Sequence, residues 1–122
     1  MGNRILIVDD AMIIRMILTK ILTMAGFQIA GEASTGAEGV RKYKEVRPDL
    51  VTMDITMPGM GGISALKAIR EFDPQAKVVI CSAMGQKALI MDAMQAGAIN
   101  FIAKPFDEAK VIETISTALQ MK

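Results

Sequence analysis

Ile5-Leu6-Ile7-Val8-Asp9-Asp10 is the most informative stretch of this sequence, because four consecutive apolar residues are followed directly by two carboxylates. An apolar run without alternation is typical of a strand that is covered on both faces, as in a parallel sheet. Three further runs are nearly continuous in the same way, with Thr52 and Asn100 as the polar interruptions: Leu50–Met53, Val78–Cys81 and Ile99–Ile102. Phe27–Ala33 is a weaker fifth run, which we expect at an edge of the sheet.

The segments between these runs have helical spacing. From Ala11 to Ala25 apolar residues form one stripe, and Gly26 can end this helix in the left-handed conformation that glycine tolerates. Thr35 and Glu38 have the spacing of a capping box, for a helix that continues to Arg47. The stripe consists of Ile14, Ile17, Leu18, Ile21 and Leu22, and the remaining helices are expected over Gly62–Phe72, Gln86–Ala96 and Phe106–Met121.

Strand and helix therefore alternate, which predicts an α/β fold. Right-handed crossover connections place helices on both faces of a twisted parallel sheet. A chain of 122 residues has the length of one domain, and we expect a single domain over residues 1–122. In such a sheet, ligands bind at the carboxyl ends of the strands.

The composition excludes several classes of function. Lys and Arg total 14 against 13 for Asp and Glu, so no basic surface for nucleic acid is expected. No apolar stretch is long enough to cross a membrane, and we expect a cytoplasmic protein that binds no membrane. The absence of histidine excludes histidine catalysis and histidine metal sites. Cys81 lies in an apolar run, where a buried structural thiol is expected.

Polar side chains stand at the ends of the predicted strands. Asp9 and Asp10 follow the first strand, Asp54 ends the third, Ser82 follows the fourth and Lys104 follows the fifth. Because the carboxyl ends of parallel strands share one edge of the sheet, we expect these side chains to lie close together.

Each of these residues also has an ordinary structural explanation. An aspartate or serine there could cap a helix or sit in a solvated turn, and Lys104 could be a surface lysine. Convergence on one edge favours a site instead, since three carboxylates repel one another without a counter-charge. Lys104 and a bound cation would supply that charge. Oxygen ligands suit Mg²⁺, which is the usual partner of a phosphoryl group.

Four stretches together resemble the receiver domains of two-component signalling. They are Ile5-Leu6-Ile7-Val8-Asp9-Asp10, Val51-Thr52-Met53-Asp54-Ile55-Thr56-Met57-Pro58, Cys81-Ser82-Ala83 and Lys104-Pro105-Phe106, in the family's order and spacing. The stretches Ser82-Ala83-Met84-Gly85-Gln86 and Ala96-Gly97-Ala98 resemble single-domain chemotaxis response regulators. The resemblance implies a flavodoxin-like (βα)5 fold, with strand order 2-1-3-4-5 and a cis peptide bond between Lys104 and Pro105.

The resemblance also implies a phosphorylation site at the sheet edge. Asp54 is then the phosphoacceptor, and the phosphoryl group comes from a phosphohistidine on a sensor histidine kinase. Asp10, Asp54 and the backbone carbonyl of Thr56 are expected to ligate Mg²⁺, while Asp9 acts through a metal-bound water. An aspartate that attacks phosphorus is already ionised at neutral pH, which suits a chain without histidine.

An output through protein binding is implied as well. Lys104 and Ser82 are expected to contact the phosphoryl oxygens, and Phe101 takes the place of an aromatic switch residue. We expect a monomer that binds a downstream protein, the flagellar motor switch in chemotaxis. A phosphatase is expected as a further partner. The expected partner face consists of Lys87, Ile90, Met91 and Phe101.

Two residues depart from the pattern of the family. Phe101 lacks the hydroxyl group of many chemotaxis members, so a burial switch cannot depend on a tyrosine hydrogen bond. Gly61 stands where the family usually has a polar residue. The loss of a side-chain cap predicts a looser connection into the helix that starts at Gly62.

Two other classes of function fit the sequence less well. A small Mg²⁺-dependent phosphatase with an aspartyl-phosphate typically needs an acid/base aspartate two residues beyond the nucleophile, where Thr56 stands. A flavodoxin-like cofactor binder would need a phosphate-cradling loop, which the sequence lacks. We therefore expect no enzyme in the usual sense, but an acceptor domain that dephosphorylates itself slowly.

Overall fold

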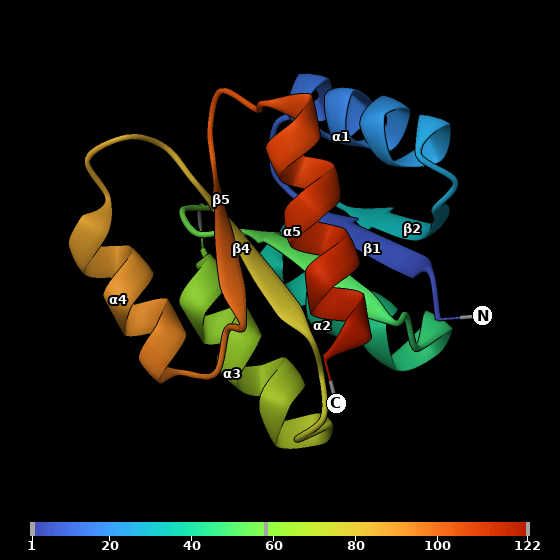
Figure 1. Ribbon diagram of the computed structural model, residues 1–122. Helices are drawn as coiled ribbons and strands as arrows, with labels where there is room; N and C mark the ends of the chain where they lie inside the picture. Colours follow the sequence, from blue (N-terminus) through green and yellow to red (C-terminus); the bar gives the residue numbers. More distant parts are fainter. Residues whose placement is uncertain (1, 58, 122) are drawn as a thin grey trace.

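The computed structural model describes residues 2–57 and 59–121, so that Met1, Pro58 and Lys122 lie outside the described residues. Within the described part, parallel strands alternate with helices in a five-stranded sheet (Figure 1). The strand order β2-β1-β3-β4-β5 confirms the predicted α/β fold of flavodoxin-like topology. The strands are β1 (Arg4–Val8), β2 (Gln28–Ala33), β3 (Leu50–Asp54), β4 (Val78–Ser82) and β5 (Asn100–Ala103), and the helices are α1 (Met12–Met24), α2 (Gly36–Val46), α3 (Gly62–Phe72), α4 (Lys87–Gln95) and α5 (Glu108–Gln120).

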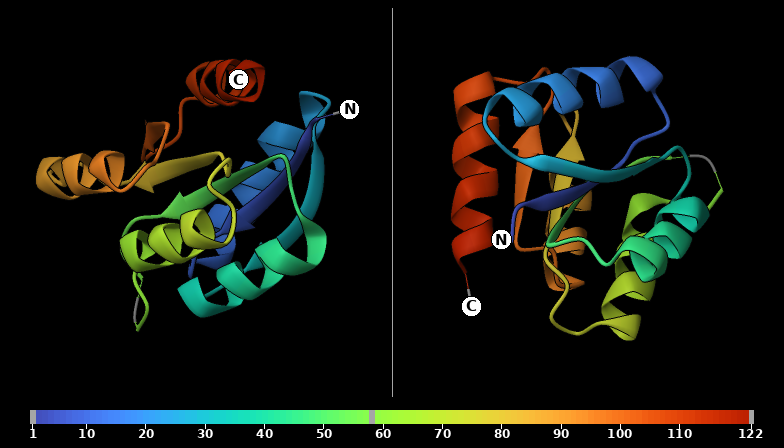
Figure 2. Two further views of the ribbon diagram at one scale, coloured as in Figure 1. Left: turned by 90° about the horizontal axis from the view of Figure 1, so that it is seen from below. Right: turned by 90° about the vertical axis from the view of Figure 1, so that its right-hand side faces the viewer.

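Helices cover both faces of the sheet, as the views in Figure 2 show. Ile5 and Ile7 of β1 pack with Leu18 on the face of α1 and α5. Leu6 and Val8, which alternate with them, belong to the core under α2, α3 and α4. Because helices exclude water from both sides, both faces of a central strand must be apolar, which explains the apolar runs without alternation.

Local signals begin and end the helices near the predicted positions. Gly26 has a φ of 95° directly after the C-cap residue of α1. Thr35 caps α2, since its Oγ1 accepts a hydrogen bond from the Glu38 backbone N–H (3.0 Å). The Glu38 carboxylate accepts the N–H of Ser34 (2.7 Å), one residue earlier than a capping box requires. The weak run near Phe27 forms edge strand β2, as expected.

The predicted stripe of α1 is wrong at one residue. Leu18 and Leu22 are buried, whereas Ile17 is 40% exposed. α1 contacts β1, β2 and α5, so only the side of the helix that faces these elements is covered. Cys81 is buried as predicted, and burial raises the pKa of its thiol to about 12. No helix in the described part of the chain is both long and apolar enough to span a bilayer.

Candidate functional site

Hydrogen bonding in the sheet brings the predicted site residues to one edge. Asp54, the last residue of β3, pairs with Cys81 of β4, which puts Ser82 one residue beyond it. Ser82 pairs with Ala103 of β5, and its carbonyl accepts the backbone N–H of Lys104 (2.7 Å). β1 lies on the other side of β3 and ends just before the aspartate pair. Asp54 therefore lies at the edge of the sheet where the carboxyl ends of β1, β3, β4 and β5 come together.

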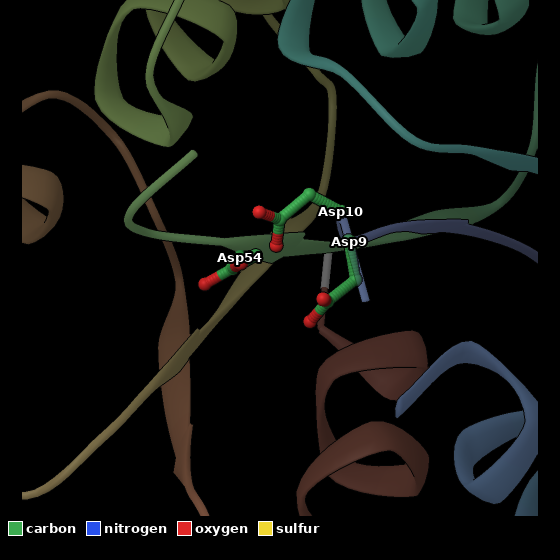
Figure 3. Close-up of side chains that lie close together, drawn as sticks. All are labelled: Asp9, Asp10 and Asp54. Carbon is green, nitrogen blue, oxygen red and sulfur yellow. The ribbon is translucent and has the colours of Figure 1, made fainter. Parts of the chain in front are cut away.

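Asp9, Asp10 and Asp54 form a cluster of carboxylates, which Figure 3 shows with the Asp10 side chain turned toward Asp54. One oxygen atom of each residue lies within 4.8 Å of the others. Asp9 and Asp54 are buried, with exposed fractions of 1% and 4%, whereas Asp10 is exposed. Carboxylates at this spacing repel one another strongly unless positive charge lies among them.

Asp9 is held in place by contacts with two neighbouring elements. Its Oδ1 accepts the backbone N–H of Ala11 (2.9 Å) at the start of α1. Its Oδ2 accepts a hydrogen bond from Lys104 (2.9 Å), and its carbonyl oxygen accepts one from Arg15 (2.7 Å). Asp9 therefore joins the start of α1 to Lys104 but does not cap the helix, whose N-cap residue is Ala11.

Lys104 supplies positive charge to both buried carboxylates. Its Nζ lies 2.9 Å from Asp9 Oδ2 and 3.4 Å from Asp54 Oδ1. Burial alone would lower the pKa of Lys104, but the hydrogen bond to Asp9 and the charges of Asp54 and Asp9 raise the pKa overall. The ammonium group therefore stays charged at neutral pH. The Lys104–Pro105 peptide bond is cis, as the resemblance implied.

Asp54 has a perturbed carboxyl group. Burial, followed by the charge of Asp9, raises the pKa of Asp54 to about 6. Lys104 and the backbone N–H of Thr56, which donates to Asp54 Oδ1 (3.3 Å), act in the opposite direction. Since the pKa stays below 7, most of the carboxyl group is ionised at neutral pH and can act as a nucleophile without a general base.

The donor set at this edge fits a hard divalent cation. Three carboxylates against one ammonium group leave an excess of two negative charges when all are ionised (3 − 1 = 2). Carboxylate oxygens are the ligands that Mg²⁺ and Ca²⁺ prefer, and a site with few protein ligands and access to water suits Mg²⁺. Asp10 is the exposed member, so its side leaves the cluster open to solvent.

The remaining predicted residues lie around the cluster. Ser82 is 1% exposed at the end of β4, and Phe101 of β5 is 43% exposed. In α4, Lys87 is exposed and Met91 is 56% exposed, whereas Ile90 is half-buried against the core. The predicted partner face is therefore drawn from α4 and β5, with Ile90 only partly accessible.

Sequence reasoning missed two residues at the site. An added Cβ on Gly62, the first residue of α3, would overlap the backbone carbonyl oxygen of Asp54. Gln86 contacts both Thr56 and the loop after β4 through its side chain. A glycine at a helix start is a weak signal in the sequence, and a glutamine offers none, because both roles depend on which segments the fold brings together.

Comparisons with known proteins agree on one family. A model described as "Response regulator receiver domain" matches residues 5–116. The chain is 56% identical to "Chemotaxis protein CheY" of Thermotoga maritima over 116 residues, which cover 95% of this chain and 97% of the relative. It is also 56% identical to "Chemotaxis protein CheY" of Bacillus subtilis over 119 residues, covering 98% of this chain and 99% of the relative.

Solved structures give the same result for the fold. A chain of the CheX–CheY–BeF3–Mg²⁺ complex from Borrelia burgdorferi superposes with a TM-score of 0.90 at 44% identity, covering 98% of this chain and 90% of the other. The response regulator domain of Thermotoga maritima CheB superposes with a TM-score of 0.89 at 34% identity, covering 98% and 97%.

Proposed function

The chain belongs to the response regulator receiver domain family, and we propose that it is a phosphorylation-switched signalling protein of chemotaxis. Asp54 is the phosphoacceptor. The observation that carries this assignment is the position of its buried carboxylate, at the end of β3 and 3.4 Å from the Lys104 ammonium group. We assign one receiver domain to residues 1–122, and we expect it to act as a monomer in the cytoplasm.

The chemistry needs no catalytic histidine in this chain. A carboxylate oxygen of Asp54 attacks the phosphorus of a phosphohistidine on a sensor kinase, a P–O bond forms and the P–N bond breaks. The electron pair of that bond stays on the leaving imidazole nitrogen. Lys104 balances charge on the transferred group, and the Ser82 hydroxyl donates to one of its oxygens. Catalysis is then mostly positioning and charge neutralisation.

Asp9, Asp10, Asp54 and the backbone carbonyl of Thr56 would hold Mg²⁺, with Asp9 acting through a bound water. When bound, Mg²⁺ supplies the positive charge that offsets the carboxylates and the incoming phosphoryl oxygens. Receiver domains of this type are signalling proteins rather than enzymes. Hydrolysis of the aspartyl-phosphate in the isolated chain is proposed to be slow, so that a separate phosphatase can end the signal.

The output is binding of a downstream protein, which in chemotaxis is the flagellar motor switch. The proposed partner face consists of Lys87, Ile90, Met91 and Phe101. Ser82 moves toward the phosphoryl group, and Phe101 turns inward from its 43% exposed position to fill the space that this movement leaves. Full burial of an exposed phenylalanine side chain is worth about 1.5–3 kcal/mol. Because Phe101 is already partly covered, its inward turn gains only a part of this free energy, which still biases a rotamer equilibrium without a hydroxyl group.

Phosphorylation by a small donor tests the proposal. Incubation with acetyl phosphate and Mg²⁺ should add one phosphoryl group, which Asp54→Asn and EDTA should each abolish. Asp92→Asn, which removes an exposed carboxylate from α4, is the matched control and should label like wild type. Equal labelling of Asp54→Asn and wild type would disprove the assignment. Mg²⁺ at ten times its dissociation constant should also stabilise the fold by about 1.4 kcal/mol.

A further inference from the structure

Gln86 links the acceptor side of the site to the loop between β4 and α4. Its Oε1 accepts the backbone N–H of Ala83 at 2.8 Å, a short and well-formed hydrogen bond. Its Nε2 lies 3.5 Å from the Thr56 hydroxyl, a longer and weaker contact. One carboxamide therefore joins the residue directly after Ser82 to a residue two positions beyond Asp54.

These contacts continue to the acceptor itself. The backbone N–H of Thr56 donates to Asp54 Oδ1 (3.3 Å), so a chain of polar contacts runs from Asp54 through Thr56 and Gln86 to Ala83. Both ends of the chain lie next to groups that the phosphoryl group must contact. Gln86 is thus placed to respond to any movement of the loop after β4 relative to the β3 end.

The backbone of Gln86 belongs to the next element. Gln86 is the N-cap residue of α4, and its carbonyl oxygen accepts the first helical hydrogen bond, from Ile90 N–H (2.9 Å). The side chain does not cap its own helix, because it is engaged with Ala83. A change in this side chain therefore reaches the start of α4, which carries Lys87, Ile90 and Met91.

We propose that Gln86 is a positioning residue, which holds the loop after β4 in its unphosphorylated arrangement and is released when Asp54 carries a phosphoryl group. The release on phosphorylation rests on the proposed function, whereas the resting contact does not. Movement of Ser82 toward the phosphoryl group carries the adjacent Ala83 N–H with it. The bond to Gln86 Oε1 is then broken, and the start of α4 is freed to adjust.

The resting contact can be tested without any phosphoryl chemistry. Amide hydrogen exchange of Ala83 should be about fivefold faster in Gln86→Ala, since one net hydrogen bond is worth about 1 kcal/mol. Gln86→Glu keeps an acceptor for the Ala83 N–H and should keep the slow exchange. Gln95→Ala, at the exposed C-terminal end of the same helix, is the matched control and should change nothing. Unaltered exchange in Gln86→Ala would overturn the proposal.

Release is tested with beryllofluoride and Mg²⁺ as a mimic of the phosphoryl group. Gln86→Ala should bind the mimic about 2- to 5-fold more tightly than wild type or Gln95→Ala, because no contact has to be broken. In wild type, the side-chain amide resonances of Gln86 should shift on addition of the mimic, while those of Gln95 stay in place. Equal affinity in all three proteins would overturn the release. Failure of wild type to bind the mimic would instead contradict the proposed function, and exchange at Ala83 would still decide the resting contact.

Discussion

Lys104 reaches from the end of β5 to Asp9 at the end of β1, and its Nζ donates a hydrogen bond of 2.9 Å to Asp9 Oδ2. The two residues are 95 positions apart in the sequence. The exposed fraction of the Asp9 side chain is 2% and that of Lys104 is 20%, so the pair is largely removed from water. Asp54 Oδ1 lies 3.4 Å from the same ammonium group, so the charge of Lys104 offsets part of the free-energy cost of burying two carboxylates.

Removal of this cation should destabilise the metal-free protein. Lys104→Met keeps most of the volume but leaves Asp9 and Asp54 without a counter-charge, and we expect a loss of about 1–3 kcal/mol at pH 7.5 in EDTA. Mg²⁺ should restore part of that loss. Lys110→Met removes an exposed lysine and is the control. Urea unfolding measures both effects, and equal stability of Lys104→Met and wild type in EDTA would show that Lys104 is not needed for charge balance.

The raised pKa of Asp54 predicts a pH-dependent stability. Because the pKa is about 6 in the fold and 3.8 in the reference state, the folded state binds the proton more tightly. The contribution of Asp54 to the free energy of unfolding is therefore fully present below pH 4 and is lost as the pH rises through 6. Asp54→Asn should stabilise the metal-free protein at pH 7.5, by at most about 3 kcal/mol, and should have little effect at pH 4.

Denaturant unfolding of wild type and Asp54→Asn across this pH range, in EDTA, measures that difference. Asp92→Asn removes a charge of the same sign from the exposed surface of α4 and is the control for the loss of a carboxylate outside the cluster. A constant difference between Asp54→Asn and wild type from pH 4 to pH 7.5 would contradict the assigned shift.

The relay from the acceptor to the partner face depends on Ser82. Ser82→Ala should still accept a phosphoryl group on Asp54, but should lose most of the gain in target affinity, which we expect at about 5- to 150-fold in wild type. Titration of a target against the phosphorylated proteins measures this gain, with Ser64→Ala on the exposed side of α3 as control. If Ser82→Ala and wild type gain equally, Ser82 is not the relay. NMR contacts of the Phe101 ring test its inward turn separately.

Gly62 should be required for the geometry of the acceptor. In Gly62→Ala the new methyl group would overlap the Asp54 carbonyl oxygen, so the backbone of Asp54 and Ile55 must shift. We expect weaker Mg²⁺ binding and slower labelling by acetyl phosphate, together with a loss of stability of about 1–3 kcal/mol. In Gly31→Ala the new methyl group makes only ordinary contacts, with the side chains of Leu6 and Lys42, and this variant is the control. Normal Mg²⁺ affinity in Gly62→Ala would refute a role in positioning.

Periodicity accounts for most of what could be predicted. The strands near Ile5, Leu50 and Val78 were recognisable because burial on both faces requires a nearly continuous apolar run, which is a local property of the sequence. The run near Ile99 also forms a strand, but the expected cover on both faces is wrong there, because β5 is an edge strand in which only Ile102 is buried. Helix ends at Gly26 and Thr35 were recognisable because caps are short-range interactions. Ile17 was placed wrongly, since periodicity shows which residues share a side of a helix but not how wide the covered side is.

The fold class, the alternation of strands and helices, and the set of polar residues at the strand ends can be read from the sequence alone, because they follow from backbone propensity and from patterns of a few residues. Which of these groups are in contact depends on the packing of the folded chain. Segments that are distant in sequence, or separated by a turn, are joined by the 2.9 Å bond between Lys104 and Asp9, by the close approach of Gly62 to Asp54 and by the two contacts of Gln86. The raised pKa of Asp54 likewise results from burial and from the charge of Asp9, which follows another strand. Side-chain reach and burial set such contacts, and both depend on how the whole sheet and its helices pack.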